Sequence, residues 1–255
     1  MIVSLTTYPA RIKTVWITIA SLLNQTYKPK VVVLYLAEEQ FPNGFEELPR
    51  KLLKLQKRGL EIVFVEDDLK PHKKYYYAFK EYKNDYVITA DDDIFYPENH
   101  IEEFIRASIE HPDAVICKRS HKIGFVEKDG EVIGFSPYNT WVDNKTEKPD
   151  IVTLPVGCNG VLYKPDMFDD EIFNIVNIKK HSLYTDDLWL KAMEIKCGIL
   201  AYNCSDEPLV YFDNIFTANT GLWHKNTGDD NRNDLAWVRL VEIYPELNIR
   251  LNIYE

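Results

Sequence analysis

The chain has 255 residues, of which 45% are hydrophobic and 27% are charged, and its formal net charge is -10 at pH 7. This length and composition are those of a folded globular protein with one large or two small domains, and they argue against wholesale disorder. The acidic balance argues against a general nucleic-acid-binding protein, because such a protein needs a broad basic surface.

The first part of the chain alternates apolar strand patterns with helical patterns. Strands are predicted at residues 2–5, 31–36, 60–65 and 86–90. Helices are predicted through Trp16 and Leu22, over residues 46–58 with Gly59 as the stop, and over residues 73–82 after Pro71. Strand and helix alternating at this spacing predict an α/β fold with a mostly parallel, Rossmann-like sheet flanked by helices.

The second part of the chain is more mixed. Helices are predicted at residues 99–111, 186–196 and 235–241, strands at 152–154, 161–163 and 199–202, and a hairpin turn at 128–130. Residues 219–233 are rich in Asn, Gly and Asp, which predicts a loop or lid. No linker is visible, so one domain over residues 1–255 is expected, with a nucleotide half (1–97) and an acceptor and catalytic half (98–255). A smaller, mixed region on the acceptor side is expected beside the mostly parallel sheet.

Polar clusters follow three of the predicted strands. They are Thr6-Thr7, Glu66-Asp67-Asp68 and Asp91-Asp92-Asp93. Ligands of open α/β sheets collect at the carboxyl ends of the strands, so these clusters are expected to share one site.

The Asp91-Asp92-Asp93 run is the first candidate for chemistry. Three buried anions need a cation or hydrogen bonds to compensate them. In an extended segment Asp91 and Asp93 point the same way and Asp92 points oppositely, and two carboxylates on one side suit a hard divalent cation that also takes phosphate oxygens. A solvated acidic loop is the alternative, and the position after a buried strand favours the cation site.

His224 and the Asp186-Asp187 pair are the next candidates. The His224 imidazole would complete a carboxylate and histidine shell that favours manganese over calcium, whereas the alternative is a surface histidine packed beside Trp223. Trp223 offers a stacking face for a sugar. Acids at the start of the 186–196 helix suit its dipole and its cap, but capping accounts for only one of the two, and the other could serve as a general base.

Basic residues near the strand ends leave two readings open. Lys73 or Lys74 could reach a diphosphate as a point charge or belong to a solvated helix start, and Arg11 and Lys13 present the same choice. The basic face of residues 50–58 suits either anionic lipid or plain solvent. The segment 157–160, with Gly157 and Asn159, allows close backbone approach to a ligand.

The cysteines and the N-terminus favour a cytoplasmic location. Four cysteines without a CxxC pair argue against structural zinc and for unpaired, buried or half-buried thiols in a reducing compartment. The chain start lacks the basic lead and long apolar run of a signal peptide, and no stretch is apolar enough to span a bilayer.

Taken in order, these motifs resemble those of bacterial family-2-like GT-A glycosyltransferases of polysaccharide and surface-glycan pathways. Residues 3–12 resemble the opening strand of the family, 67–74 the segment after its third strand, 91–97 its DXD motif, 186–190 its xED motif, and His224 its late metal-binding histidine. The resemblance spans most of the chain.

The resemblance implies a role for each matching residue. It implies that the donor site is formed by Thr6, Tyr8, Arg11, Asp67, Lys73, Lys74, Asp91 and Asp92. Asp93 and His224, with Asp91, would hold Mn²⁺ or Mg²⁺, and Gly157, Asn159 and Trp223 would face the acceptor or the sugar. Asp187 would be the base of an inverting reaction, but Asp186 stands where many relatives have glutamate, so either aspartate could take the proton.

The function predicted from the sequence is therefore a metal-dependent glycosyltransferase. It would move a sugar from a nucleotide-diphosphate donor, with UDP as the family default, to a glycan or lipid-linked acceptor, in the cytoplasm with peripheral membrane contact. A retaining transferase of the same fold is one alternative. A nucleotidyltransferase is disfavoured because residues 6–9 lack its glycine-rich loop, and a glycan-binding module would have little use for clustered carboxylates.

Overall fold

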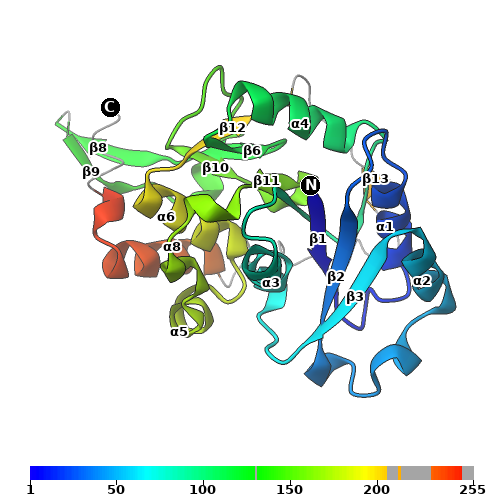
Figure 1. Cartoon of the computed structure of the whole chain (residues 1–255). Helices are drawn as coiled ribbons and strands as arrows, with labels where there is room; N and C mark the ends of the chain where they lie inside the picture. Colours follow the sequence, from blue (N-terminus) through cyan, green and yellow to red (C-terminus); the bar gives the residue numbers. More distant parts are fainter. Residues whose placement is uncertain (130, 206–211, 214–230, 249–255) are drawn as a thin grey trace.

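A seven-stranded sheet forms the centre of the computed structural model, which describes residues 1–129, 131–205, 212–213 and 231–248. Its strand order is β12-β6-β11-β4-β1-β2-β3. The strands are β1 Ile2–Thr6, β2 Val31–Ala37, β3 Leu60–Val65, β4 Val87–Ala90, β6 Ala114–Cys117, β11 Val161–Tyr163 and β12 Leu200–Asn203. Only β11 is antiparallel to its neighbours, so the predicted mostly parallel α/β sheet is confirmed (Figure 1).

Helices cover both faces of this sheet. They are α1 Val15–Leu23, α2 Arg50–Lys54, α3 Lys73–Glu81, α4 His100–Glu110, α5 Ile175–Asn177, α6 Asp186–Cys197 and α8 Arg232–Ile243. Successive strand residues point to opposite faces, so Ile2 packs in a core with α3 and α6, while Val3 packs in a second core with α1, α2 and α4. The two cores fix the sheet, and hence its strand ends, from both sides.

The prediction of one continuous helix over residues 46–58 is wrong. Pro49 divides it: a 3-10 turn, Gly44–Glu47, precedes the proline, and the five-residue α2 and a second 3-10 turn, Leu55–Arg58, follow it. Proline has no N–H to donate and favours an extended residue before it. The predicted stop is confirmed, because Gly59 adopts a left-handed conformation with φ of 108°.

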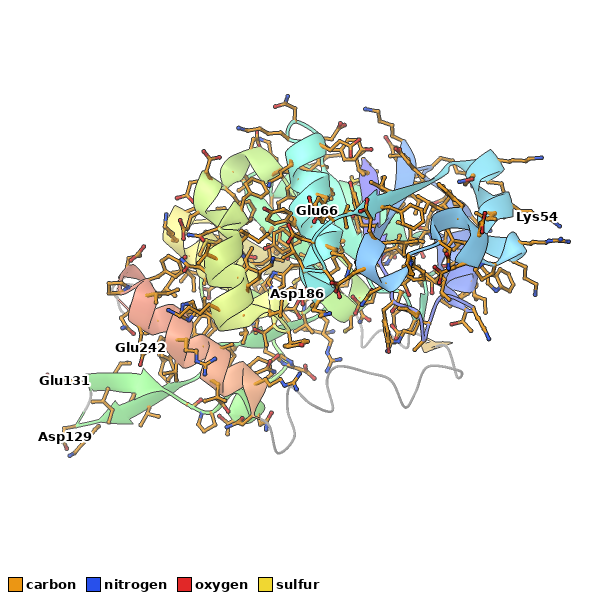
Figure 2. All side chains as sticks on the ribbon, turned by 90° about the horizontal axis from the view of Figure 1, so that it is seen from below. Lys54, Glu66, Asp129, Glu131, Asp186 and Glu242 are labelled. Atoms are coloured by element: carbon orange, nitrogen blue, oxygen red, sulfur yellow. The ribbon has the colours of Figure 1, made fainter. Side chains whose placement is uncertain are left out.

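Three small antiparallel pairs complete the fold. They are β5 Ile94–Phe95 with β13 Phe212–Asp213, β7 Ser120–Lys122 with β10 Thr153–Pro155, and β8 Phe125–Lys128 with β9 Glu131–Phe135. The β8–β9 pairing confirms a hairpin at the predicted position, and it projects from the body with Asp129 and Glu131 at its tip (Figures 1 and 2).

The C-terminal helix is longer than predicted. Helix α8 begins at Arg232, so the last two residues of the predicted loop at 219–233 are helical. Asn233, Ala236, Trp237 and Leu240 are buried on one face, so the added turn contributes the polar residue Asn233 to the buried side of the helix.

Two further sequence expectations can be compared with the structure. None of the four cysteines forms a disulfide; Cys117 is buried and the other three are half-buried, as predicted. Within the described ranges, no helix is both long and apolar enough to cross a lipid bilayer.

Candidate active site

The carboxyl ends of β1 and β4 place two predicted clusters side by side. Leu5 pairs with Ala90 in the parallel ladder, so Thr6 and Asp91 follow at neighbouring positions of the same edge. The chain then turns at Asp92 and Asp93 rather than continuing as a strand. The expected alternation, with Asp92 opposite to Asp93, is therefore wrong.

Arg11 pairs with both the second and the third aspartate of the run. Its Nη1 lies 2.5 Å from Asp92 Oδ1 and 2.9 Å from Asp93 Oδ2. The Thr7 hydroxyl donates to the other oxygen of Asp92, and Thr18 Oγ1 donates to the Asp92 carbonyl. Burial raises the pKa of Asp92, and the Arg11 guanidinium opposes that rise. Asp92 is thus a buried structural carboxylate, whereas Asp93 is partly exposed.

Lys74 is the buried cation of the neighbouring cluster. Its Nζ lies 2.9 Å from Asp91 Oδ1 and 3.0 Å from Asp186 Oδ2, and only 6% of its side chain is exposed. Burial alone would lower the pKa of Lys74, but Asp186, Asp91 and Asp187 raise it well above its ordinary value. The Lys74 ammonium therefore connects the end of β4 to the start of α6, and it brings the predicted cluster at Asp91 together with the predicted Asp186-Asp187 pair.

Asp187 lies against the backbone of the segment 157–160. The Gly157 N–H is 3.2 Å from each Asp187 carboxylate oxygen. Burial and then Asp186 raise the pKa of Asp187 to about 8, against the lowering effects of Lys74 and the Gly157 hydrogen bond. A Cβ at position 157 would lie 2.9 Å from Asp187 Oδ1 and 3.0 Å from Lys74 Nζ, so this close approach needs glycine.

The start of α6 is not capped by a side chain. Thr185 is the N-cap residue, but its hydroxyl donates to Ser182 O and makes no capping hydrogen bond. Asp186 and Asp187 both lie in the first turn, and Asp186 makes its ion pair with Lys74. Figure 2 shows Asp186 near the middle of the molecule.

His72, which the sequence did not single out, connects the start of α3 to the segment before α6. Its Nε2 lies 2.8 Å from Ser182 O, which can only accept, so Nε2 donates and Nδ1 accepts from Tyr75 Oη at 3.1 Å. Burial lowers the pKa of His72 to about 4, so the imidazole is neutral. This bond fixes Lys74 relative to the segment that leads into α6.

The Asp67-Asp68 cluster holds other cations. Asp68 accepts from both Lys70 and Lys73, and these hydrogen bonds lower its pKa although burial acts to raise it. Asp67 Oδ1 accepts from Lys179 Nζ at 2.6 Å. Lys73 is thus paired with Asp68, whereas Lys74 reaches the central cluster.

The remaining predicted residues are placed as follows. Thr6 Oγ1 donates to Tyr35 O at 2.9 Å, and the Arg11 guanidinium lies 5.7 Å from the centre of the Tyr8 ring. Asn159 is buried in the 3-10 turn Gly157–Asn159. Trp223, His224 and most of the predicted loop at 219–233 lie outside the described residues.

A further strand end contributes groups that the sequence analysis missed. Arg119 follows β6, and its Nη1 donates to Cys158 Sγ at 3.6 Å. Burial raises the pKa of Cys158 to about 11, so it remains a thiol. Burial also raises the pKa of Tyr138, with a smaller contribution from Asp187. The apolar run Ala114–Cys117 was the signal that could have located this strand end.

Asp91 and Asp93, at the carboxyl end of β4, are the two carboxylates considered for a metal ion. In the ranges that the structure describes, no group of three or more His, Cys, Asp and Glu is arranged to hold a metal ion. Magnesium-type sites commonly use one or two carboxylates and complete their shell with phosphate oxygens and water. Asp91 and Asp93, whose side chains are 32% and 22% exposed, are carboxylates of the type that such a shell uses, and each also pairs with a cation, Lys74 or Arg11.

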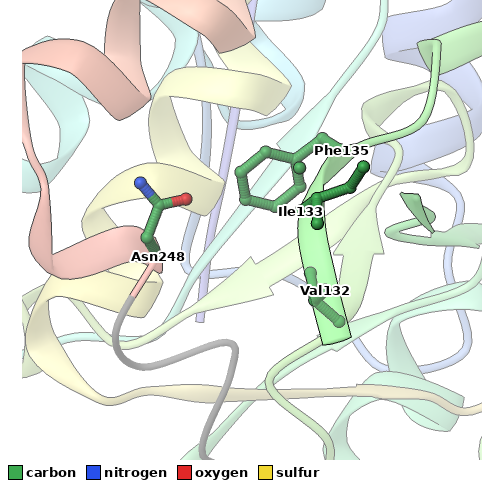
Figure 3. Close-up of a pocket in the computed structure, with 5 residues that line it drawn as sticks. Val132, Ile133, Phe135 and Asn248 are labelled. Carbon is green, nitrogen blue, oxygen red and sulfur yellow. The ribbon is translucent and has the colours of Figure 1, made fainter. Parts of the chain in front are cut away.

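The hollow in Figure 3 is a different feature. It is lined by Val132, Ile133, Gly134, Phe135 and Asn248, between β9 and the chain after α8. None of these residues titrates, and none of the carboxylates described above lines the hollow. The strand-end cluster is therefore the candidate active site.

A mostly parallel sheet with acids at its strand ends and an acid pair heading the facing helix is the arrangement that the sequence led us to expect of a GT-A glycosyltransferase. The sequence profile described as "Glycosyl transferase family 2" matches residues 3–166, which is more than half of the chain. The chain therefore belongs to glycosyl transferase family 2.

Other comparisons are more distant. No curated protein matches the sequence. The S. aureus TarS 1-349 structure in complex with UDP is 15% identical, with a TM-score of 0.48 over 95% of this chain and 71% of that chain. The S. aureus TarS 1-349 complex with UDP-GlcNAc is 14% identical, with a TM-score of 0.44 over 96% of this chain and 80% of that chain. The structure of 4-diphosphocytidyl-2C-methyl-D-erythritol synthase is 9% identical, with a TM-score of 0.46 over 93% of this chain and 98% of that chain. Likenesses this remote say nothing about substrates.

Proposed function

We propose that the protein transfers a sugar from a nucleoside-diphosphate donor to an acceptor hydroxyl with inversion, and that Asp187 is the base. The observation that carries this proposal is the convergence of Asp91, Asp186 and Asp187 on Lys74, with Gly157 N–H against Asp187. A carboxylate that heads a helix and faces strand-end acids has the position that a base needs opposite a departing diphosphate.

Asp187 is a better candidate for the base than Asp186. Lys74 Nζ lies 3.0 Å from Asp186 Oδ2, so the Asp186 carboxylate is already engaged in an ion pair. The raised pKa of Asp187 brings it near neutral pH, where a general base both accepts and releases a proton efficiently. In the proposed step, Asp187 takes the acceptor hydroxyl proton, the oxygen bonds to the anomeric carbon, and the electrons of the breaking bond leave with the diphosphate.

Asp91 and Asp93 are the proposed ligands of Mn²⁺ or Mg²⁺. When bound, such an ion neutralises charge on the leaving diphosphate. Arg11 holds Asp92 and Asp93 in their turn, so this chain presents the Asp93 carboxylate at a fixed position. His224 remains a proposed third ligand.

The proposed donor is a UDP-sugar held by Thr6, Tyr8 and Asp67, and the proposed acceptor is a glycan or a lipid-linked sugar. Gly157 and Asn159 are proposed to face the acceptor, because they adjoin the base. A cytoplasmic location with peripheral membrane contact is part of the proposal, and the exposed basic residues of α2 and the turn after it support it. Sedimentation with vesicles that contain anionic lipid tests this contact, and equal sedimentation with neutral vesicles would count against it.

Thermal melting with UDP, GDP and CMP, each with and without Mn²⁺, tests the donor and the metal. A ligand at about a hundred times its dissociation constant adds about 2.7 kcal/mol of stability. We expect UDP with Mn²⁺ to raise the melting temperature most. If no nucleotide shifts the melt even with metal, the donor proposal fails.

Asp93→Asn is the matched test of the metal ligand. We expect it to lose the Mn²⁺-dependent shift and keep the fold, whereas Asp85→Asn, at an exposed pair with Lys30, should keep the shift. An unchanged shift in Asp93→Asn would remove Asp93 from the metal site. Product analysis distinguishes the alternatives: release of inorganic diphosphate would indicate a nucleotidyltransferase, and retained anomeric configuration a retaining transferase.

A further inference from the structure

Arg119 stands at the same edge as the proposed catalytic carboxylates. Strands β6 and β4 are both antiparallel to β11, so they run in the same direction and end at one edge of the sheet. Arg119 comes two residues after the end of β6. Its carbonyl accepts from Val156 N–H, and its guanidinium contacts Cys158, so it brackets Gly157, which holds Asp187.

The other cations of this edge already have carboxylate partners at close range. Within the described residues, these pairs are Arg11 with Asp92 and Asp93, Lys70 and Lys73 with Asp68, Lys74 with Asp91 and Asp186, and Lys118 with Glu103.

Arg119 differs from them. Its partners are the Cys158 thiol and, at 3.8 Å from Nε, the exposed carboxylate of Asp143, which is too far for a hydrogen bond. A guanidinium carries five N–H donors in a planar fork that matches phosphate and carboxylate. Part of that fork is open to a ligand, because the side chain is 48% exposed.

The position of Arg119 favours the acceptor over the donor. In an inverting displacement the base and the attacking hydroxyl lie on one face of the anomeric carbon, and the diphosphate leaves from the other. Arg119 contacts the turn that holds the base, Asp187. Arg119 also follows β6, which lies two strands, or roughly 10 Å, from β4 in the sheet. Strands β1, β2 and β3, which lead to the proposed donor residues, lie on the other side of β4.

We propose that Arg119 binds an anionic group, a phosphate or a carboxylate, on the acceptor, close to the hydroxyl that is glycosylated. The inference rests on the proposed function, since it takes Asp187 as the base. Tyr138 supplies an aromatic wall beside this anion site: its ring packs on Trp141 with centroids 5.1 Å apart, and its environment includes both Arg119 and Asp187. The acceptor is thus an acidic glycan or a sugar phosphate rather than a neutral sugar.

Binding measurements with defined probes test the proposal. Glucose 1-phosphate, glucuronate and methyl glucoside are titrated by calorimetry into the full chain in the presence of saturating UDP and Mn²⁺, so that the donor phosphate site is filled. The variants are Arg119→Ala, Arg119→Lys and, as a control with the same change of charge, Arg106→Ala, an exposed arginine of α4.

We expect the two anionic probes to bind the wild type more tightly than methyl glucoside. Arg119→Ala should weaken their binding by about tenfold or more, and Arg119→Lys should weaken it less, because it keeps the charge but loses the fork. Arg106→Ala should bind like the wild type. UDP affinity, measured separately, should be unchanged in all variants.

Three results would overturn the proposal: no preference of the wild type for the anionic probes, unchanged binding in Arg119→Ala, or a fall in UDP affinity that matches the fall for the anionic probes. That last result would assign Arg119 to the donor. The titrations of glucose 1-phosphate are repeated without UDP. If UDP fails to bind the wild type while anion binding still depends on Arg119, the donor proposal fails and the anion site stands.

Discussion

Replacing Asp187 by asparagine should inactivate the protein and make it more stable at neutral pH. Asparagine keeps the size of the side chain and an oxygen that can accept from Gly157 N–H, but it carries no charge. The buried carboxylate of Asp187 faces Asp186 and Asp91, and its pKa rises from 3.8 to about 8. The substitution removes this repulsion along with the base.

The pH dependence of the effect follows from the raised pKa. Between pH 3.8 and about 8 the folded protein retains a proton that the unfolded chain has released. The free energy of unfolding therefore falls as the pH rises through this range, by about 1.4 kcal/mol per pH unit for one proton. From pH 5 to pH 7, the wild type should lose about 3 kcal/mol relative to Asp187→Asn, which has no titrating group there.

Urea unfolding followed by tryptophan fluorescence at pH 5, 6 and 7 measures this difference. Asp85→Asn serves as the control, because Asp85 forms an exposed pair with Lys30 at 3.4 Å, and its removal should change stability by less than about 1 kcal/mol. Parallel pH profiles for the wild type and Asp187→Asn would refute the electrostatic account of this site. Full transfer activity in Asp187→Asn would refute its role as the base.

Three other predictions concern the same cluster. Lys74→Met should lower the free energy of unfolding by about 3–5 kcal/mol in urea, because it leaves buried carboxylates without a cation. The control Lys30→Met, which breaks an exposed pair, should lower it by less than about 1 kcal/mol. Equal losses in the two variants would contradict the pairing of Lys74 with these carboxylates. Gly157→Ala should lower the transfer rate by about tenfold or more and lower the melting temperature, while Gly134→Ala, where a Cβ meets nothing within 4 Å, should do neither. The value of kcat/KM should rise with pH and level off above about 8 as Asp187 ionises, and a flat profile from pH 6 to 9 would speak against it.

The regular elements could be predicted because their patterns are local. The apolar strands at 31–36 and 60–65 and the glycine stop at Gly59 correspond to β2, β3 and the end of the turn before β3. The antiparallel insertion of β11 between β4 and β6 could not be predicted, because its three residues carry no information about their partners. Strand direction here is set by tertiary packing, which a single sequence does not display.

The candidate site was predictable in its parts but not in its pairings. Strand-end acids were visible because polar residues followed buried strands, as Asp91 does. The pairing of Arg11 with Asp92 and Asp93 depended on a turn, whereas the alternation argument assumed an extended chain. Arg119 was overlooked because the four-residue strand before it was not identified.

The charges of the cluster explain how stability and the proposed chemistry are linked. Among the residues that the structure describes, five carboxylates, those of Asp91-Asp92-Asp93 and Asp186-Asp187, contact or surround two buried cations, Arg11 and Lys74. Burial and then this excess negative charge raise the pKa of Asp187 and penalise its ionised form, so both oppose folding as the pH rises. The same excess attracts a divalent cation and gives the proposed base its proton affinity. Neutralising Asp187, whose pKa is raised in this cluster, should therefore stabilise the fold and impair transfer together.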